Sequence, residues 1–215
     1  MEKETSIELV NSIAVENLNA AGRDLAEVAV DSVLKEGVLR DIPVFNTLAA
    51  LYRTGVEIRQ QLFIKKVVNF LKELSNTTFE KRQKFVEDIE RDSNRKREFG
   101  EILVLLIDRA DSLQKPSILG RLIKYLILGY ISYEDATRLA FIVDRVYISD
   151  LNYLLKFTPG IQANPGIAAS LQSVGLLTFA GMDGGILDEP SSGGIVYELN
   201  KYGQMLLEYG LEKAV

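Results

Sequence analysis

The sequence predicts a mainly α-helical protein, with a multi-helix N-terminal domain over residues 1–131 and a winged-helix-like C-terminal module with a short β-hairpin over residues 132–215. Three observations predict this fold class. Apolar residues recur near a 3.6-residue period through most of the chain. Residues that start or stop helices separate these stretches. After Gly175 the period changes, and two short runs have the composition of β-strands.

The N-terminal domain begins with one long predicted helix over residues 5–36. Gly37 is suited to end this helix, and Pro43 keeps the residue before it extended. A second helical block follows over residues 44–74, with a break near Thr54–Gly55. One face of the first helix is rich in alanine, which lets another helix approach closely. We therefore predict an interaction surface formed by Ile7, Ala14, Leu18, Ala21, Leu25 and Val28.

Helix-initiating residues divide the rest of this domain. Thr77 and Glu80 match a capping box, and Pro116 lies where the missing N–H of a first-turn proline costs nothing. The helices predicted from these signals and from apolar spacing cover residues 78–92, 94–110 and 116–130.

The C-terminal module is predicted from the order of its elements. It runs helix, short helix, helix, strand, glycine-containing loop, strand and helix, which is the outline of a winged helix-turn-helix. An ordinary helical domain that carries a β-hairpin fits the same pattern, and the sequence does not separate the two. The predicted helices start at Ser132, Ser149, Asn164 and Asn200, and the predicted strands are Leu176–Ala180 and Ile195–Leu199.

The composition excludes several classes of chemistry. The chain has no cysteine and no histidine, so disulfides, thiolate metal sites and every mechanism that needs an imidazole are excluded. We expect no cofactor and identify no catalytic residue, although an enzyme that uses only carboxylates, lysine, serine or tyrosine stays open. We expect a cytoplasmic protein, because we find neither a signal peptide nor an uncharged apolar run of about 18 residues.

Charge is distributed unevenly along the chain, whose net charge is -5. Residues 53–97 hold twelve Lys or Arg against seven Asp or Glu, whereas residues 157–215 hold two against six. Between residues 80 and 97, Lys and Arg alternate with Asp and Glu at helical spacing, which is typical of a solvated helix face whose charges form ion pairs with one another. The alternative interpretation is that the basic residues of this segment form a phosphate- or lipid-binding patch. The basic cluster comprises Lys81, Arg82, Lys84, Arg91, Arg95, Lys96 and Arg97.

Two further features point away from ligand binding. Glu101, Asp108 and Asp111 could share a helix face and hold a divalent cation, but surface carboxylates at this spacing are common and we expect no metal site. Helix 166–174 would be the element offered to a DNA groove, yet it carries no positive charge. The loop acids Asp183, Asp188 and Glu189 would be repelled by phosphate, so we expect this module to pack against protein.

The segment over residues 5–52 is long and apolar, and it contains few charged residues after Asp41. A helix that is apolar over much of its circumference must be buried. Burial in the core is the preferred interpretation, and self-association comes next. Membrane insertion is opposed by Asp24, Glu27 and Asp31 but stays open.

Three stretches of the C-terminal half resemble the Abi-alpha family of bacterial abortive-infection proteins. They are Gly129–Leu139 with its Ser-x-x-Asp cap, Leu171–Leu177 ending in Gly-Leu-Leu, and Tyr197–Gly203. The resemblance implies a bacterial phage-defence role and brings no catalytic residues with it.

We therefore expect a non-enzymatic interaction protein that acts through oligomerisation or partner binding, in a bacterial phage-defence system as the resemblance implies. Two alternatives stay open. One is a nucleic-acid-binding regulator that uses the winged module or residues 81–97, and the other is a membrane-perturbing effector that uses residues 5–52.

Overall fold

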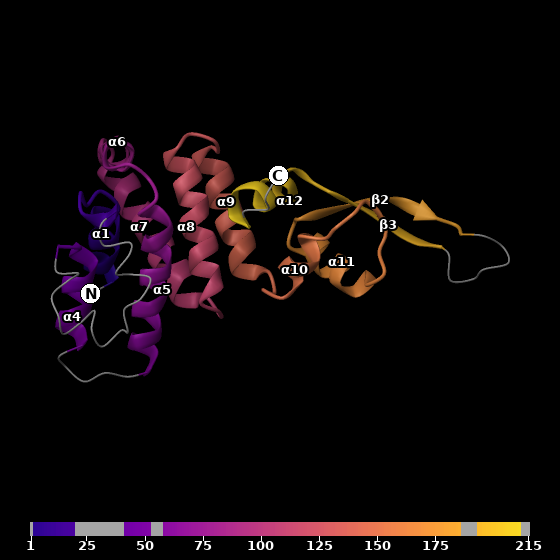
Figure 1. Ribbon diagram of the computed structural model, residues 1–215, viewed down its shortest axis with the longest axis horizontal. Coiled ribbons are helices and arrows are strands. Elements are labelled where there is room, and N and C mark those ends of the chain that lie inside the picture. Colours follow the sequence, from indigo (N-terminus) through magenta and orange to yellow (C-terminus); the bar gives the residue numbers. More distant parts are fainter. Residues whose placement is uncertain (1, 20–40, 53–57, 186–192, 212–215) are drawn as a thin grey trace. The chain divides into compact units, whose positions relative to one another are not determined.

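The computed structural model describes residues 2–19, 41–52, 58–185 and 193–211 (Figure 1). Most of these residues lie in helices, and one small antiparallel sheet lies near the C-terminus, which confirms the mainly α-helical class. The chain divides into two compact units, Met1–Ser132 and Tyr133–Val215, and each is described by itself.

The first unit is a set of packed helices. Helix α1 packs on α4 and α7, and α5 packs on α8, so the core is formed between these pairs. Its largest buried apolar side chains include Leu9, Ile13, Phe70, Leu71 and Leu103. The helices described in this unit are α1 (Glu2–Ile13), α4 (Pro43–Tyr52), α5 (Ile58–Leu74), α6 (Phe79–Glu90), α7 (Ser93–Arg109) and α8 (Gln114–Ile127).

Helix α1 ends much earlier than the sequence pattern predicts. The predicted helix over residues 5–36 was wrong at this point, because α1 stops at Ile13 and the chain turns over the next four residues. The carbonyls of Ile13 and Val15, which would accept the N–H groups of residues 17 and 19 in a continued helix, instead accept hydrogen bonds from the buried guanidinium of Arg82. Leu18 and Asn19 are helical again after this turn, and residues 20–36 of the predicted helix lie outside the described residues.

Two glycines let helices of this unit approach closely. A Cβ at Gly100 of α7 would lie 2.5 Å from the carbonyl oxygen of Ser6 in α1. A Cβ at Gly120 of α8 would lie 2.5 Å from the carbonyl oxygen of Phe70 in α5. Larger residues at either site would force the helix pair apart, since packed interiors leave no room for an added methyl group.

The predicted side-chain cap at the start of α6 is absent from the structure. The predicted capping box at Thr77 and Glu80 is wrong, because the N-cap of α6 is Thr78 and it makes no side-chain capping bond. The carbonyl of Thr77 instead accepts hydrogen bonds from Arg82 and Asn19, so this residue is committed to a tertiary contact. Helix α7 has a side-chain cap, since Asp92 accepts the N–H groups of Asn94 and Arg95.

The second unit combines helices with a three-stranded antiparallel sheet of order β1-β3-β2. Helix α11 packs on α10 and on β2. The core of this unit includes the buried side chains of Leu151, Leu154, Leu171, Leu176 and Tyr197. The elements are α9 (Tyr133–Arg145), α10 (Asp150–Leu154), β1 (Gly160–Ile161), α11 (Pro165–Ser173), β2 (Leu177–Asp183), β3 (Gly194–Leu199), α12 (Lys201–Met205) and a π-helical turn (Leu206–Gly210).

The hairpin of β2 and β3 contains a bulge. Phe179 pairs with Tyr197 and Gly181 pairs with Val196, so Ala180 is the extra residue in β2. Both predicted strands are present, and β2 continues three residues further than predicted, to Asp183. Strand β1, which has only two residues, was not predicted.

Candidate functional site

The predicted basic cluster does not form a surface of uniform charge. Lys81, Lys84, Arg91, Arg95 and Arg97 are exposed, but exposed acids lie among them along α6 and the start of α7. Arg91 lies 3.1 Å from Asp88, and Arg97 lies 3.9 Å from Glu101. The exposed acids between residues 80 and 101 are Glu80, Glu87, Asp88, Glu90, Asp92, Glu98 and Glu101, so this surface carries no excess of positive charge.

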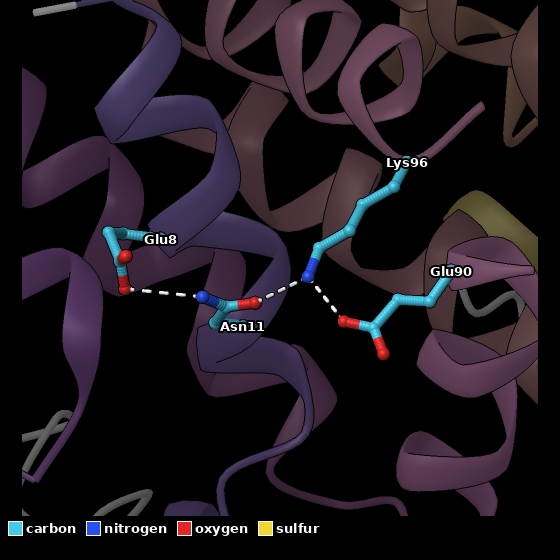
Figure 2. A network of polar contacts seen from close by, with 4 residues as sticks. All are labelled: Glu8, Asn11, Glu90 and Lys96. Carbon is cyan, nitrogen blue, oxygen red and sulfur yellow. Dashed lines mark hydrogen bonds and ion pairs between the residues drawn. The ribbon is translucent and has the colours of Figure 1, made fainter. Parts of the chain in front are cut away.

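Lys96, the half-buried member of the cluster, joins a network that ties three helices together (Figure 2). Its ammonium group donates a hydrogen bond to Asn11 Oδ1 at 2.8 Å and forms an ion pair with Glu90. Asn11 in turn donates to Glu8 at 3.4 Å. Lys96 therefore holds the start of α7 against α1 and α6, and its charge is used within the fold.

Arg82 was predicted to be part of the basic patch, but this prediction is wrong because the residue does not belong to the exposed cluster. Its side chain is fully buried, and it binds the carbonyls of Ile13, Val15 and Thr77 together with Asn19 Oδ1. Burial lowers the pKa of the guanidinium to about 10, and the nearby carboxylate of Glu80 opposes this shift. The carbonyl oxygens at the end of α1 stabilise the positive charge, as expected at the negative end of a helix dipole.

The predicted interaction face of the first helix is only partly described. Ile7 is 39% exposed, Ala14 is half-buried in the turn after α1, and Leu18 is fully buried. Within α1 the side that faces the core contains Ser6, Leu9, Val10 and Ile13, so Ile7 lies off that side. Ala21, Leu25 and Val28 lie outside the described residues, and an interaction through this face stays a prediction.

The three carboxylates considered as a cation site each have a basic neighbour. Arg59 lies 2.8 Å from Asp108, Lys115 lies 3.1 Å from Asp111, and Arg97 pairs with Glu101 as described above. Among the residues that the structure describes, no group of three or more acids is arranged to hold a metal ion.

The end of α7 also binds two lysines that the sequence did not single out. Lys66 donates to the carbonyl of Asp108 at 2.6 Å, and the side chain of Lys115 is almost completely buried beside Asp111. Burial lowers the pKa of Lys66 below its ordinary value, and the negative charge of Asp108 opposes this shift only in part. Cations are favourable at the end of a helix, so these contacts stabilise α7 and the turn that follows it.

The exposed surface of α11 is uncharged. Its first turn exposes Pro165 and Gly166, and Ala169, Gln172 and Ser173 are exposed further along. Ser170 donates to the buried carboxylate of Asp150 at 2.9 Å, which fixes α11 against α10. A DNA-reading helix needs donors to phosphate and base edges, and this helix offers neither lysine nor arginine.

The hairpin exposes apolar side chains that the sequence analysis did not identify. Met182 is 78% exposed, Phe179 is 51% exposed and Ile195 is 41% exposed. Phe179 and Ile195 lie within the two predicted strands, but strand composition does not show which apolar side chains the rest of the fold covers.

Within the described parts of the chain, none of the helices combines the length and apolar character that a bilayer-spanning segment needs. Comparisons with protein-family models, with curated proteins and with solved structures found no match to this chain.

Proposed function

We propose that the protein is a non-enzymatic interaction protein that binds a protein partner. The observation that best supports this proposal is the surface of the second unit, where α11 exposes only uncharged residues and the hairpin exposes large apolar ones. Contiguous apolar side chains on a folded surface are characteristic of protein-binding sites.

The order of elements in the second unit supports a winged-helix-like arrangement. Helices α9, α10 and α11 are followed by the β2–β3 hairpin, with α11 in the place of the helix that would enter a DNA groove. Because the affinity of such a module for DNA depends on contacts from Lys and Arg to phosphate, the uncharged α11 favours a protein ligand.

The resemblance to the Abi-alpha family supports a bacterial phage-defence setting for this interaction. The proposal is tested by expressing the chain in a bacterial host and measuring plaque formation by a panel of phages. Protection that is lost on deletion of residues 133–215 supports the setting, and plaque counts equal to those of an empty-vector strain across the panel contradict it.

Partner binding is tested directly by cross-linking in the cells that naturally produce the protein, followed by affinity purification. We expect a specific co-purifying protein, or a dimer or larger species in multi-angle light scattering at micromolar concentration. A strict monomer that retains no partner would refute the proposal.

Gel retardation with duplex DNA provides the comparison. The proposal predicts no retardation at about 50 mM salt, the low end of the range (about 50–200 mM) over which rising salt steeply weakens affinity that comes from phosphate contacts. A complex that weakens steeply as salt is raised would support the nucleic-acid-binding alternative instead.

A further inference from the structure

Helices α5 and α8 concentrate positive charge in the first unit. They pack side by side (Figure 1), and their sequences contain seven Lys or Arg against one acid, Glu73. This excess contrasts with the net charge of -5 of the whole chain. An excess of one sign at a surface attracts ligands of the opposite sign. The seven bases are Arg59, Lys65, Lys66, Lys72, Lys115, Arg121 and Lys124.

Ion pairs within the fold use only some of these bases. The acids in α5, in the last turn of α7 and in the turn before α8 are each paired with one base. The pairs are Glu73 with Arg121 at 2.9 Å, Asp108 with Arg59 at 2.8 Å and Asp111 with Lys115 at 3.1 Å. Lys65 and Lys72 are exposed, and neither forms an ion pair with a described residue. Their charge is therefore available to a ligand.

The two lysines lie on one open stripe of α5. Leu62, Lys65, Asn69 and Lys72 follow one another at spacings of three or four residues, so they share one side of the helix. Leu62 is 44% exposed. The side-chain amide of Asn69 donates to the carbonyl of Leu113 at 3.0 Å, which holds Leu113, itself 41% exposed, beside the stretch between the two lysines. We call the surface formed by Leu62, Lys65, Lys72 and Leu113 the α5 stripe.

We propose that the α5 stripe is a docking surface for an acidic amphipathic segment of another protein. Leu62 and Leu113 would bury apolar anchors of this segment, and the two lysines would pair with Asp or Glu beside the anchors. The lysines are seven residues apart, about 10 Å along the helix axis, which matches two acids seven residues apart in a helical ligand. This inference goes beyond the proposed function, whose supporting surface lies in the second unit.

The same side chains disfavour other occupants of the α5 stripe. A second copy joined through the same stripe would bring lysine against lysine, and like charges across an interface are unfavourable. A single-stranded nucleic acid would meet leucines where stacking of its bases needs aromatic rings. Two partly exposed leucines also offer little of the apolar area with which a helix enters a membrane interface.

The proposal is tested with three synthetic amphipathic peptides of about 18 residues, five helical turns. The first has leucine on one face and glutamate on the other, the second replaces every glutamate with lysine, and the third replaces every leucine of the first with serine. Fluorescence anisotropy with the full chain measures affinity. We expect the leucine–glutamate peptide to bind most tightly, with an affinity that falls as salt is raised.

Nuclear magnetic resonance identifies the site. We expect the largest shift changes from the leucine–glutamate peptide at the methyl groups of Leu62 and Leu113. Leu62→Ser should weaken binding by about tenfold or more, as for an anchor at the centre of an interface. Lys65→Gln and Lys72→Gln should each weaken it by up to about fivefold, as for exposed charges at the rim, and should reduce its dependence on salt.

The chain offers a matched control for each kind of change. Lys84→Gln removes an exposed lysine from α6, where exposed acids lie among the bases, and Phe141→Ser removes a 39% exposed apolar side chain from α9. We expect both variants to bind the leucine–glutamate peptide as the unchanged protein does. Circular dichroism shows whether each variant keeps its helical content, which we expect because the replaced side chains are exposed.

Four outcomes would overturn the inference: no binding of the leucine–glutamate peptide, equal binding of the leucine–lysine or serine–glutamate peptide, shift changes that fall outside α5 and the turn before α8, or a dimer that Lys65→Gln stabilises or dissociates. Tighter binding of an oligothymidine or of phosphatidylserine vesicles than of the leucine–glutamate peptide would overturn it in favour of a nucleic acid or a membrane.

Failure of the inference is distinguishable from failure of the proposed function. A natural partner that is recovered equally by the unchanged protein and by Leu62→Ser would leave partner binding intact and remove the α5 stripe from it.

Discussion

Replacing Arg82 with methionine tests how α1 ends. Methionine retains much of the apolar stem of the side chain and removes the guanidinium that binds three carbonyl oxygens and Asn19. Arg82 remains charged at neutral pH because its pKa, although lowered by burial, is still about 10. The substitution therefore removes a buried cation together with its hydrogen bonds.

The loss of stability expected for Arg82→Met depends on how many of the carbonyl oxygens bound by Arg82 still accept a hydrogen bond from another donor. The carbonyl of Val15 also accepts from the N–H of Leu18 at 3.3 Å, and that of Thr77 also accepts from Asn19 at 3.1 Å. The carbonyl of Ile13 depends on Arg82 Nε at 2.8 Å, and an unpartnered buried acceptor costs about 1–3 kcal/mol. The charge-assisted hydrogen bonds of the guanidinium are lost as well, but the substitution also removes the cost of burying its charge. We therefore expect a loss of about 3 kcal/mol in the free energy of unfolding.

Urea denaturation followed by circular dichroism measures this loss, and hydrogen exchange shows whether it is located in α1 and α6. The matched control is Arg91→Met at the end of the same helix, where the arginine side chain is 81% exposed and forms an ion pair with Asp88. That control should change stability by less than about 0.5 kcal/mol. Equal stabilities for the two variants would refute the assignment of Arg82 as the residue that ends α1.

Three further predictions concern local contacts. Gly100→Ala should destabilise the first unit by about 1–3 kcal/mol in urea denaturation because its Cβ would meet α1 backbone at 2.5 Å, whereas Gly166→Ala, with open space around the added methyl, should not destabilise the second. Ser12→Ala should cost about 1 kcal/mol in the same assay, since the Ser12 hydroxyl accepts the N–H of Val44 at the start of α4. The hydrogen bond from Lys201 to Asp135 raises the pKa of Lys201, so the stabilisation by this pair is fully present below pH 10.5, the ordinary pKa of lysine, and is lost as pH rises through the folded-state pKa. Asp135→Asn should lower that pKa in a nitrogen-15 titration of the lysine side chain, and an unchanged pKa would contradict the contact between Lys201 and Asp135. A Gly100→Ala or Ser12→Ala variant that is as stable as the unchanged protein would contradict the contact made by that residue.

Much of the helical layout was predictable because it depends on neighbours in the sequence. The helices from α5 to α11 lie close to their predicted ranges, since apolar spacing, Pro116, Asn164 and the break at Gly175 act within one or two turns. The side chain of Asn200 caps α12 by accepting the N–H of Gly203, as its position predicts.

The candidate surfaces were less predictable because burial depends on distant contacts. Arg82 had the same local context as the exposed bases around it, and only carbonyls up to 69 residues away in the sequence distinguish it. The exposed apolar side chains of the β2–β3 hairpin were missed because β-propensity indicates a strand but not which part of it the rest of the fold covers.

The sequence by itself determined the mainly helical class and the absence of imidazole and thiol chemistry, because periodicity and composition are properties of the chain alone. Only the tertiary structure decided that α1 ends at Ile13, that Arg82 is buried while its basic neighbours are exposed, and that Phe179, Met182 and Ile195 are open to solvent. These properties arise when segments far apart in the sequence pack together, since packing determines which polar groups find partners and which apolar side chains stay uncovered.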